Sequence, residues 1–107
     1  MRAYVKYLLA AFLILLIAVI AAAQTAPSNG RLIDNPVYQK DCAKCHGKTG
    51  EGRHFAGPSL VSEKVGALSS EELRSIIANG KHHMPKFEGK LTAEEIDTLV
   101  REIRQSK

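Results

Sequence analysis

Two cysteines and a histidine stand within five consecutive residues, Cys42-Ala43-Lys44-Cys45-His46, and form the motif with the clearest chemistry. This spacing sets two thiols against the two vinyl groups of one haem and places the adjacent imidazole beneath the iron, and it is the attachment signature of c-type haem. A disulfide, which export would permit, is a competing interpretation. A thioredoxin-like redox pair would need a βαβ setting, and a zinc site would need a second pair of ligands. Neither occurs in the sequence.

Iron in such a haem takes a fifth ligand, here the motif histidine, and usually a sixth. Met84 is the only methionine outside the N-terminal segment, and Pro85 after it favours an extended, stiff backbone. A lone methionine more commonly fills a core, but Met84 stands in a predicted loop, so we predict that its thioether is the sixth ligand and raises the potential. His82 and His83 are the rival ligands and would lower it. Most exposed histidines are simply solvated, and this interpretation is kept for three of them: His54, His82 and His83.

The first 23 residues have the composition of an export signal. Arg2 and Lys6 precede the uncharged residues 7–23, and small residues, Ala21-Ala22-Ala23, precede Gln24. This arrangement is typical of a cleaved secretory signal peptide. The alternative is an uncleaved membrane anchor, because residues 7–23 just reach the roughly 17–25 residues that a spanning helix needs. Either way, the rest of the chain is expected in the periplasm or at the extracytoplasmic face of the membrane.

The exported part is small and mildly basic. Without Arg2 and Lys6, 13 of the 15 basic residues remain against 11 acidic ones, a net charge of +2 that slightly favours an acidic partner. No basic run interleaved with aromatic residues indicates nucleic acid, and no Ser/His/Asp constellation or pair of carboxylates indicates hydrolysis. A core of this size supplies only about 3–5 kcal/mol, so a disulfide, metal or similar staple is expected.

The pattern of apolar and capping residues predicts an all-α domain over 35–107, preceded by a linker over 24–34. Asn35-Pro36 predicts a helix that runs to about Cys45, and glycine and proline predict a loop over 47–59. Capping boxes open two further helices, at Ser69 and at Thr92. Gly80 ends the first of them. The last helix has an apolar face made of Ile96, Leu99, Val100 and Ile103.

Taken together, residues from about 35 to 105 resemble a class I (mitochondrial-type) monohaem cytochrome c. The resemblance rests on the order and spacing of four pieces: Cys42 to Gly47, Gly57-Pro58-Ser59-Leu60, Asn79-Gly80 through Met84-Pro85-Lys86-Phe87, and the capped C-terminal helix. It implies a small bundle of three to four short helices with long loops wrapped around one covalent haem c. It also implies that the Pro58 carbonyl accepts a hydrogen bond from His46, and that Tyr38 and Phe87 pack near the haem.

The sequence departs from the family pattern at one helix crossing. Members often pack a glycine of the first helix against an aromatic residue of the last, and Asp34 and Glu102 stand at these positions. Two carboxylates would not make this contact. We therefore expect either a shifted register or neutralisation by a nearby arginine, Arg31, Arg101 or Arg104.

The resemblance and the ligand set imply a monomeric one-electron carrier that exchanges electrons with redox partner proteins, and no enzyme, because His46 and Met84 would fill both axial positions. A membrane is involved only if residues 7–23 are retained. Two alternatives stay open: a gas-binding haem sensor whose Met84 bond opens, and a cytochrome subunit of a membrane dehydrogenase or oxidase. Five lysines flank the ligand segments and would steer an acidic partner, unless they are an ordinary solvated surface: Lys44, Lys48, Lys81, Lys86 and Lys90.

Overall fold

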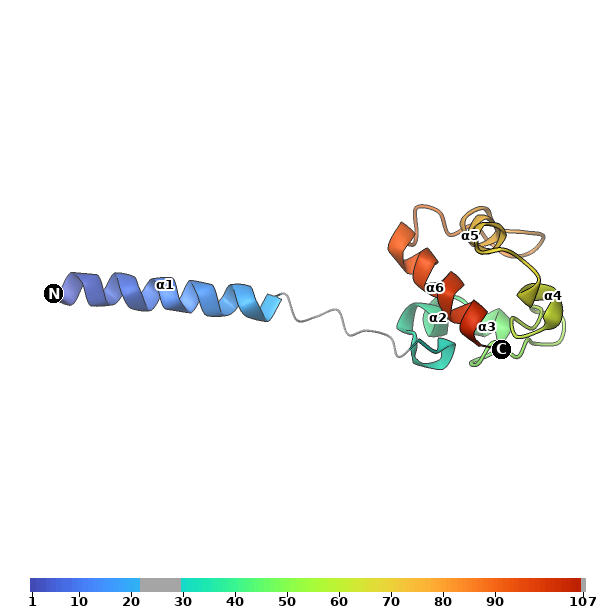
Figure 1. Cartoon of the computed structure of the whole chain (residues 1–107), viewed down its shortest axis with the longest axis horizontal. Coiled ribbons are helices and arrows are strands. Elements are labelled where there is room, and N and C mark those ends of the chain that lie inside the picture. Colours follow the sequence, from blue (N-terminus) through green and yellow to red (C-terminus); the bar gives the residue numbers. More distant parts are fainter. Residues whose placement is uncertain (22–29, 107) are drawn as a thin grey trace.

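The computed structural model describes residues 1–21 and 30–106 as helices joined by loops (Figure 1). The elements are α1 (Arg2–Ala21), the 3₁₀ turn η1 (Leu32–Asp34), α2 (Pro36–Asp41), α3 (Ala43–His46), α4 (Glu63–Gly66), α5 (Ser70–Asn79) and α6 (Ala93–Gln105). Isolated bridges occur within these described residues, but no strand does. The all-α prediction is therefore confirmed.

The N-terminal helix α1 covers most of the predicted leader. No helix among the described residues combines the length and the apolar character that a membrane span requires. Residues 22–29, which contain most of the predicted cleavage site and linker, lie outside the described residues. The last part of the predicted linker, 24–34, belongs to the packed structure, because Leu32 in η1 is 2% exposed and lies within the core.

The helix predicted from Asn35 to about Cys45 forms as two short helices. Asn35 caps α2 by accepting a hydrogen bond from the Tyr38 backbone N–H (3.1 Å), and Pro36 occupies the first helical position. At Cys42 φ (−116°) departs from the usual helical value while ψ (−40°) does not, and α3 begins at the next residue. Cys42 is therefore the N-cap of α3, and Cys45 lies three residues later, within that helix.

Helix α4 was not predicted from the sequence. It is four residues long, and the Ser62 hydroxyl caps it by accepting a hydrogen bond from the Val65 N–H (3.4 Å). A helix this short has no apolar periodicity that a sequence pattern could reveal. Because α4 is extra and the first helix is split, residues 35–106 hold five helices, α2–α6, where three to four were expected.

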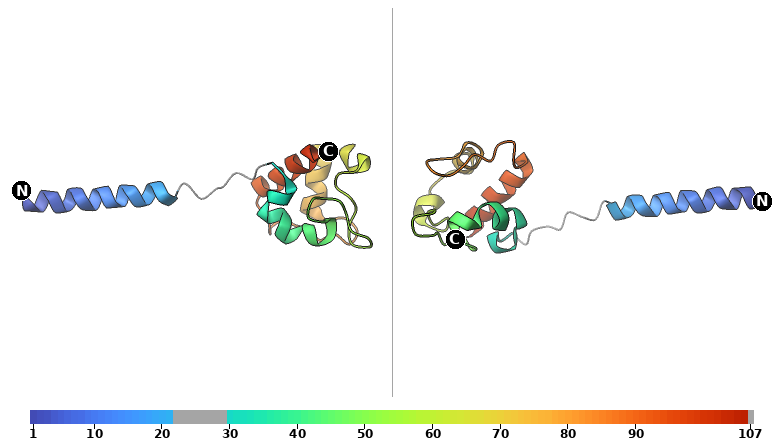
Figure 2. Two further views of the ribbon diagram at one scale, coloured as in Figure 1. Left: turned by 90° about the horizontal axis from the view of Figure 1, so that it is seen from below. Right: turned by 180° about the vertical axis from the view of Figure 1, so that it is seen from behind.

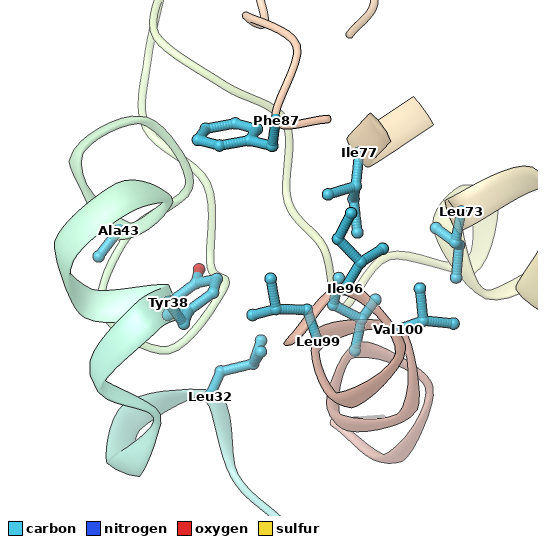
Figure 3. Close-up of a cluster of buried hydrophobic side chains, with 10 residues drawn as sticks. Leu32, Tyr38, Ala43, Leu73, Ile77, Phe87, Ile96, Leu99 and Val100 are labelled. Atoms are coloured by element: carbon cyan, nitrogen blue, oxygen red, sulfur yellow. The ribbon is translucent and has the colours of Figure 1, made fainter. Parts of the chain in front are cut away.

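Helices α5 and α6 carry the core. Both predicted capping boxes are formed, by Ser69 with Glu72 and by Thr92 with Glu95. All four residues of the predicted α6 face are buried: Ile96, Leu99, Val100 and Ile103. Figure 3 shows this face meeting Leu73 and Ile77 of α5 on one side and Tyr38 and Leu32 from the α2 side on the other.

The crossing of the first and last helices is polar. Glu102 of α6 is fully buried, and its carboxylate accepts a hydrogen bond from the side-chain amide of Asn35 (2.6 Å). Asp34 pairs instead with Arg31 at the surface (2.8 Å). The contact therefore falls one residue later than the sequence count placed it, at the residue that also caps α2. A buried carboxylate is stable here because it is hydrogen-bonded.

We expect Asn35→Ala to lower the free energy of unfolding by about 2–4 kcal/mol, because it removes the cap of α2 and one partner of a buried carboxylate together. Urea unfolding would measure the loss. Ser69→Ala is the matched control, since it removes only a cap and should cost about 1 kcal/mol. Equal losses in the two variants would contradict a stabilising role for the Asn35–Glu102 contact.

Candidate functional site

Both motif cysteines are free thiols: Cys42 lies at the α2–α3 break and Cys45 lies within α3. Cys42 is partly buried and packs against the core, whereas Cys45 is exposed. Burial, followed by the negative charges of Asp41 and Cys45, raises the pKa of Cys42 to about 11. The described residues contain no cluster of three or more histidine, cysteine or acidic side chains that could hold a metal ion. Within this part of the chain, Cys42 and Cys45 therefore have too few neighbouring donors for a four-ligand zinc site.

The His46 imidazole is held by the loop that follows it. Its Nδ1 lies 2.9 Å from the backbone carbonyl oxygen of Pro58. A carbonyl oxygen only accepts, so Nδ1 carries the proton and the lone pair resides on Nε2. The His46 carbonyl in turn accepts a hydrogen bond from the Gly52 N–H (2.7 Å). This is the contact between His46 and Pro58 that the resemblance implied, and it leaves Nε2 available to a metal ion.

Gly57 allows this contact because it has no side chain. A Cβ atom at Gly57 would lie 2.8 Å from the Cys45 carbonyl oxygen and 3.1 Å from His46 Nδ1. The Arg53–Gly57 bridge closes the tip of the same loop. Figure 2 shows the green loop folding back beside the short green helices. The printed contacts place Gly57 and Pro58 of this loop against Cys45 and His46.

A tight turn carries Met84 back toward the core. The Met84 N–H donates to the Lys81 carbonyl oxygen (2.9 Å), and the Lys81 N–H donates in return (3.3 Å). His82 (φ 53°) and His83 form the tip and are exposed, whereas Met84 is partly buried and packs against the core cluster. The turn therefore separates the three candidate ligands, with the thioether inward and both imidazoles at the surface.

Gly80 lets the chain enter that turn. Its φ of 75° is in the left-handed region, and a Cβ there would lie 2.5 Å from the Met84 carbonyl oxygen. The residue that ends α5 therefore also makes room for the Met84 backbone.

Two aromatic side chains lie on the inner side of both segments. Tyr38 is fully buried, and Phe87 is 8% exposed. The Phe87 N–H donates to the Ile77 carbonyl oxygen (3.1 Å), which ties the methionine segment to α5. In Figure 3, Tyr38, Phe87 and Ile77 face one another across the interior. Burial is the main cause that raises the pKa of Tyr38 to about 12, so its hydroxyl stays protonated and donates a hydrogen bond.

The remaining candidates lie at the surface. His54 is exposed, with its ring edge-on to Phe55 at a centroid distance of 4.6 Å. Phe55 is itself fully exposed with a φ of 63°, a backbone conformation that is rare for a bulky residue. The five lysines of the predicted docking set are also exposed: Lys44, Lys48, Lys81, Lys86 and Lys90.

The donor set fits a haem c. Two free thiols one helical turn apart match the two vinyl groups, Nε2 of His46 carries the free lone pair, and the Met84 thioether is a soft second donor. The sequence did not reveal that the side chains of Tyr38 and Gln39 hold the loop after His46, since these hydrogen bonds depend on where that loop passes.

Comparison with known proteins gives concordant matches. The family model described as "Cytochrome C oxidase, cbb3-type, subunit III" matches residues 35–101. Cytochrome c-555 of Methylococcus capsulatus is 34% identical over 97 residues, which cover 83% of this chain and 77% of that protein. Cytochrome c6 of Anabaena variabilis is 36% identical over 67 residues, 60% of this chain and 77% of that protein. Cytochrome c-551 of Bacillus subtilis is 44% identical over 50 residues, 47% of this chain and 42% of that protein.

The segment matched by the family model contains the cysteine–histidine motif, the Pro58 loop and Met84, and excludes α1. The match to cytochrome c-555 covers most of both chains. The chain therefore belongs to the cytochrome c family and is an electron carrier with one covalently attached haem c.

Proposed function

We propose that Cys42 and Cys45 attach the haem, that His46 and Met84 are its axial ligands, and that the protein shuttles single electrons between partner proteins outside the cytoplasm. The observation that carries this proposal is the hydrogen bond from His46 Nδ1 to the Pro58 carbonyl (2.9 Å), which directs Nε2 to a metal ion. The inward position of Met84 supplies the second donor.

Attachment requires no oxidant. Each thiol of Cys42 and Cys45 would add across one vinyl group of the haem, with a new carbon–sulfur bond at one vinyl carbon and the thiol hydrogen transferred to the other. The short helix α3 holds Cys42 and Cys45 on the same segment as His46, so one continuous stretch of chain supplies both thioethers and one axial ligand.

The ligand set favours electron transfer over catalysis. When bound, the haem iron accepts or releases one electron. Hydrogen bonding of His46 to Pro58 strengthens its imidazole as a donor, while the Met84 thioether favours reduced iron, so the two residues act on the potential in opposite directions. With His46 and Met84 both bound, no substrate reaches the iron. We therefore propose that the protein has no catalytic activity of its own.

We propose a location outside the cytoplasm, in the periplasm or at the outer face of the membrane. The support is the basic, then apolar, then small-residue order of residues 1–23. We also propose that the protein acts as a monomer. Redox encounters are brief and bury little surface, so a single small domain suffices for them.

The proposal predicts a specific absorption spectrum for protein matured in an exporting host with c-type haem maturation. Low-spin bands should stay with the polypeptide after acid–acetone extraction, and the oxidised protein should show the long-wavelength methionine–iron band. Met84→Ala should keep the covalent haem, lose that band and lower the potential, because the thioether favours reduced iron.

His82→Asn with His83→Asn is the control for the spectrum, and it should leave the methionine band unchanged. A wild-type protein without that band, whose spectrum changes in the double histidine variant, would assign the sixth position to a histidine. Prompt binding of CO by the reduced wild-type protein would favour the gas-binding alternative. Absence of covalent haem would overturn the proposed attachment.

Gly57→Ala should lower the free energy of unfolding by about 1–3 kcal/mol, because the new methyl group overpacks against Cys45 and His46. The Soret and methionine bands should change with it, since the His46 ring must move. Gly89→Ala is the matched control, because a Cβ there meets nothing within 4 Å although φ is 81°. If the two variants leave the spectrum equally unchanged, the close packing at Gly57 does not position His46.

The predicted lysine set is tested with two inorganic oxidants of opposite charge, ferricyanide and a cationic cobalt(III) phenanthroline complex. At low ionic strength, Lys81→Glu with Lys86→Glu should slow oxidation by ferricyanide severalfold and speed oxidation by the cation. High salt should remove both effects. Lys40→Glu with Lys64→Glu changes the net charge equally, so identical rates for the two double variants would rule out a local docking field.

A further inference from the structure

Two neighbouring side chains of α2 hold the loop that follows His46. The Tyr38 hydroxyl donates to the Gly47 carbonyl oxygen (2.7 Å), within the buried core. The Gln39 side-chain amide donates to the Lys48 carbonyl oxygen (2.8 Å) and to the Leu32 carbonyl oxygen (3.0 Å). Consecutive carbonyl groups directly after His46 are thus bonded to consecutive side chains of α2.

A short series of hydrogen bonds connects this loop to the His46 ring. From Lys48 the chain continues to Gly52, whose N–H donates to the His46 carbonyl (2.7 Å), and Gly50 receives a hydrogen bond from the Leu60 N–H (2.7 Å). Leu60 lies two residues beyond Pro58, which accepts from His46 Nδ1. The segment that contains Pro58 is therefore hydrogen-bonded to the first part of the loop, through Leu60 and Gly50.

Tyr38 is more than a packed ring in this arrangement. Phenylalanine would fill the same space, but only a hydroxyl can donate to the Gly47 carbonyl. Among residues 30–106, the other donor to that carbonyl is the Gly50 N–H, at the longer distance of 3.3 Å. The Tyr38 hydroxyl is therefore its shorter partner, and losing it leaves a buried acceptor poorly satisfied.

We propose that Tyr38 and Gln39 are positioning residues for the axial ligand His46, because they fix the loop that presents the Pro58 carbonyl to Nδ1. This inference rests on the proposed role of His46 as an iron ligand. It assigns to the two α2 side chains a function beyond packing: they keep the His46 imidazole hydrogen-bonded and therefore a strong donor.

The test compares Tyr38→Phe and Gln39→Met with Thr92→Val in the haem-bearing protein. Each of the first two removes donors to the loop and keeps most of the side-chain volume. Thr92→Val removes a hydroxyl that accepts from the Glu95 N–H at the start of α6, far along the chain from His46. The deciding measurement is the solvent exchange rate of the His46 ring N–H in the reduced protein, by NMR. The reduction potential is measured alongside.

We expect the ring N–H to exchange about fivefold faster in Tyr38→Phe and in Gln39→Met, the change that corresponds to one net hydrogen bond. The potential should rise in both, because a weaker imidazole donor stabilises oxidised iron less. Thr92→Val should lose stability with neither change. If Tyr38→Phe does not fold, Gln39→Met decides alone.

Unchanged exchange in variants that lose only stability, as Thr92→Val does, would overturn the positioning role. That result is distinct from failure of the proposed function, which would show in the wild-type protein as missing covalent haem or missing histidine ligation before any variant is compared.

Discussion

The hydrogen bond between His46 Nδ1 and the Pro58 carbonyl is the constraint around which the site is arranged. It joins the end of α3 to a loop with little regular secondary structure, and it determines which ring nitrogen of His46 is free. Loops ordinarily vary and move. Here the loop is fixed at several points: by Gly57 against Cys45, by Gly52 on the His46 carbonyl, and by side chains of α2. An irregular segment so anchored can hold a ligand as precisely as a helix does.

The helices that support this loop are themselves held together by few residues. Helices α5 and α6 supply most of the buried apolar residues, and a hydrogen bond between Asn35 and the buried Glu102 joins α6 to the start of α2. A directional bond defines a register where an apolar crossing would tolerate small shifts. Within the described residues no buried side-chain nitrogen or oxygen lacks a partner. A polar group inside so small a core is tolerable only under that condition.

Local features of the fold were predictable because their causes are local. Capping boxes at Ser69 and Thr92 and the apolar period of α6 each depend on residues within one or two turns. The spacing of Cys42, Cys45 and His46 likewise predicts haem attachment without any information about distant residues. The break at Cys42, the one-residue shift to Asn35 at the helix crossing and the hydroxyl bond of Tyr38 were not predictable, because each depends on where a distant segment passes. The family resemblance implied that the aromatic ring of Tyr38 packs near the haem, but it carried no information about the hydroxyl.

The two proposed axial ligands enter the fold in different ways. His46 stands next to the attachment cysteines, so the iron would keep this neighbour however the chain is arranged, whereas Met84 reaches the core only through the turn from Lys81 and the docking of Phe87 on α5. Bringing that segment back requires a long loop to close, at an entropic cost that grows slowly with its length. If both residues bind the iron as proposed, ligation by Met84 would depend on the tertiary structure, whereas ligation by His46 would depend only on the local sequence. The methionine–iron absorption band would then report whether the segment around Met84 has folded back, independently of haem attachment at Cys42 and Cys45.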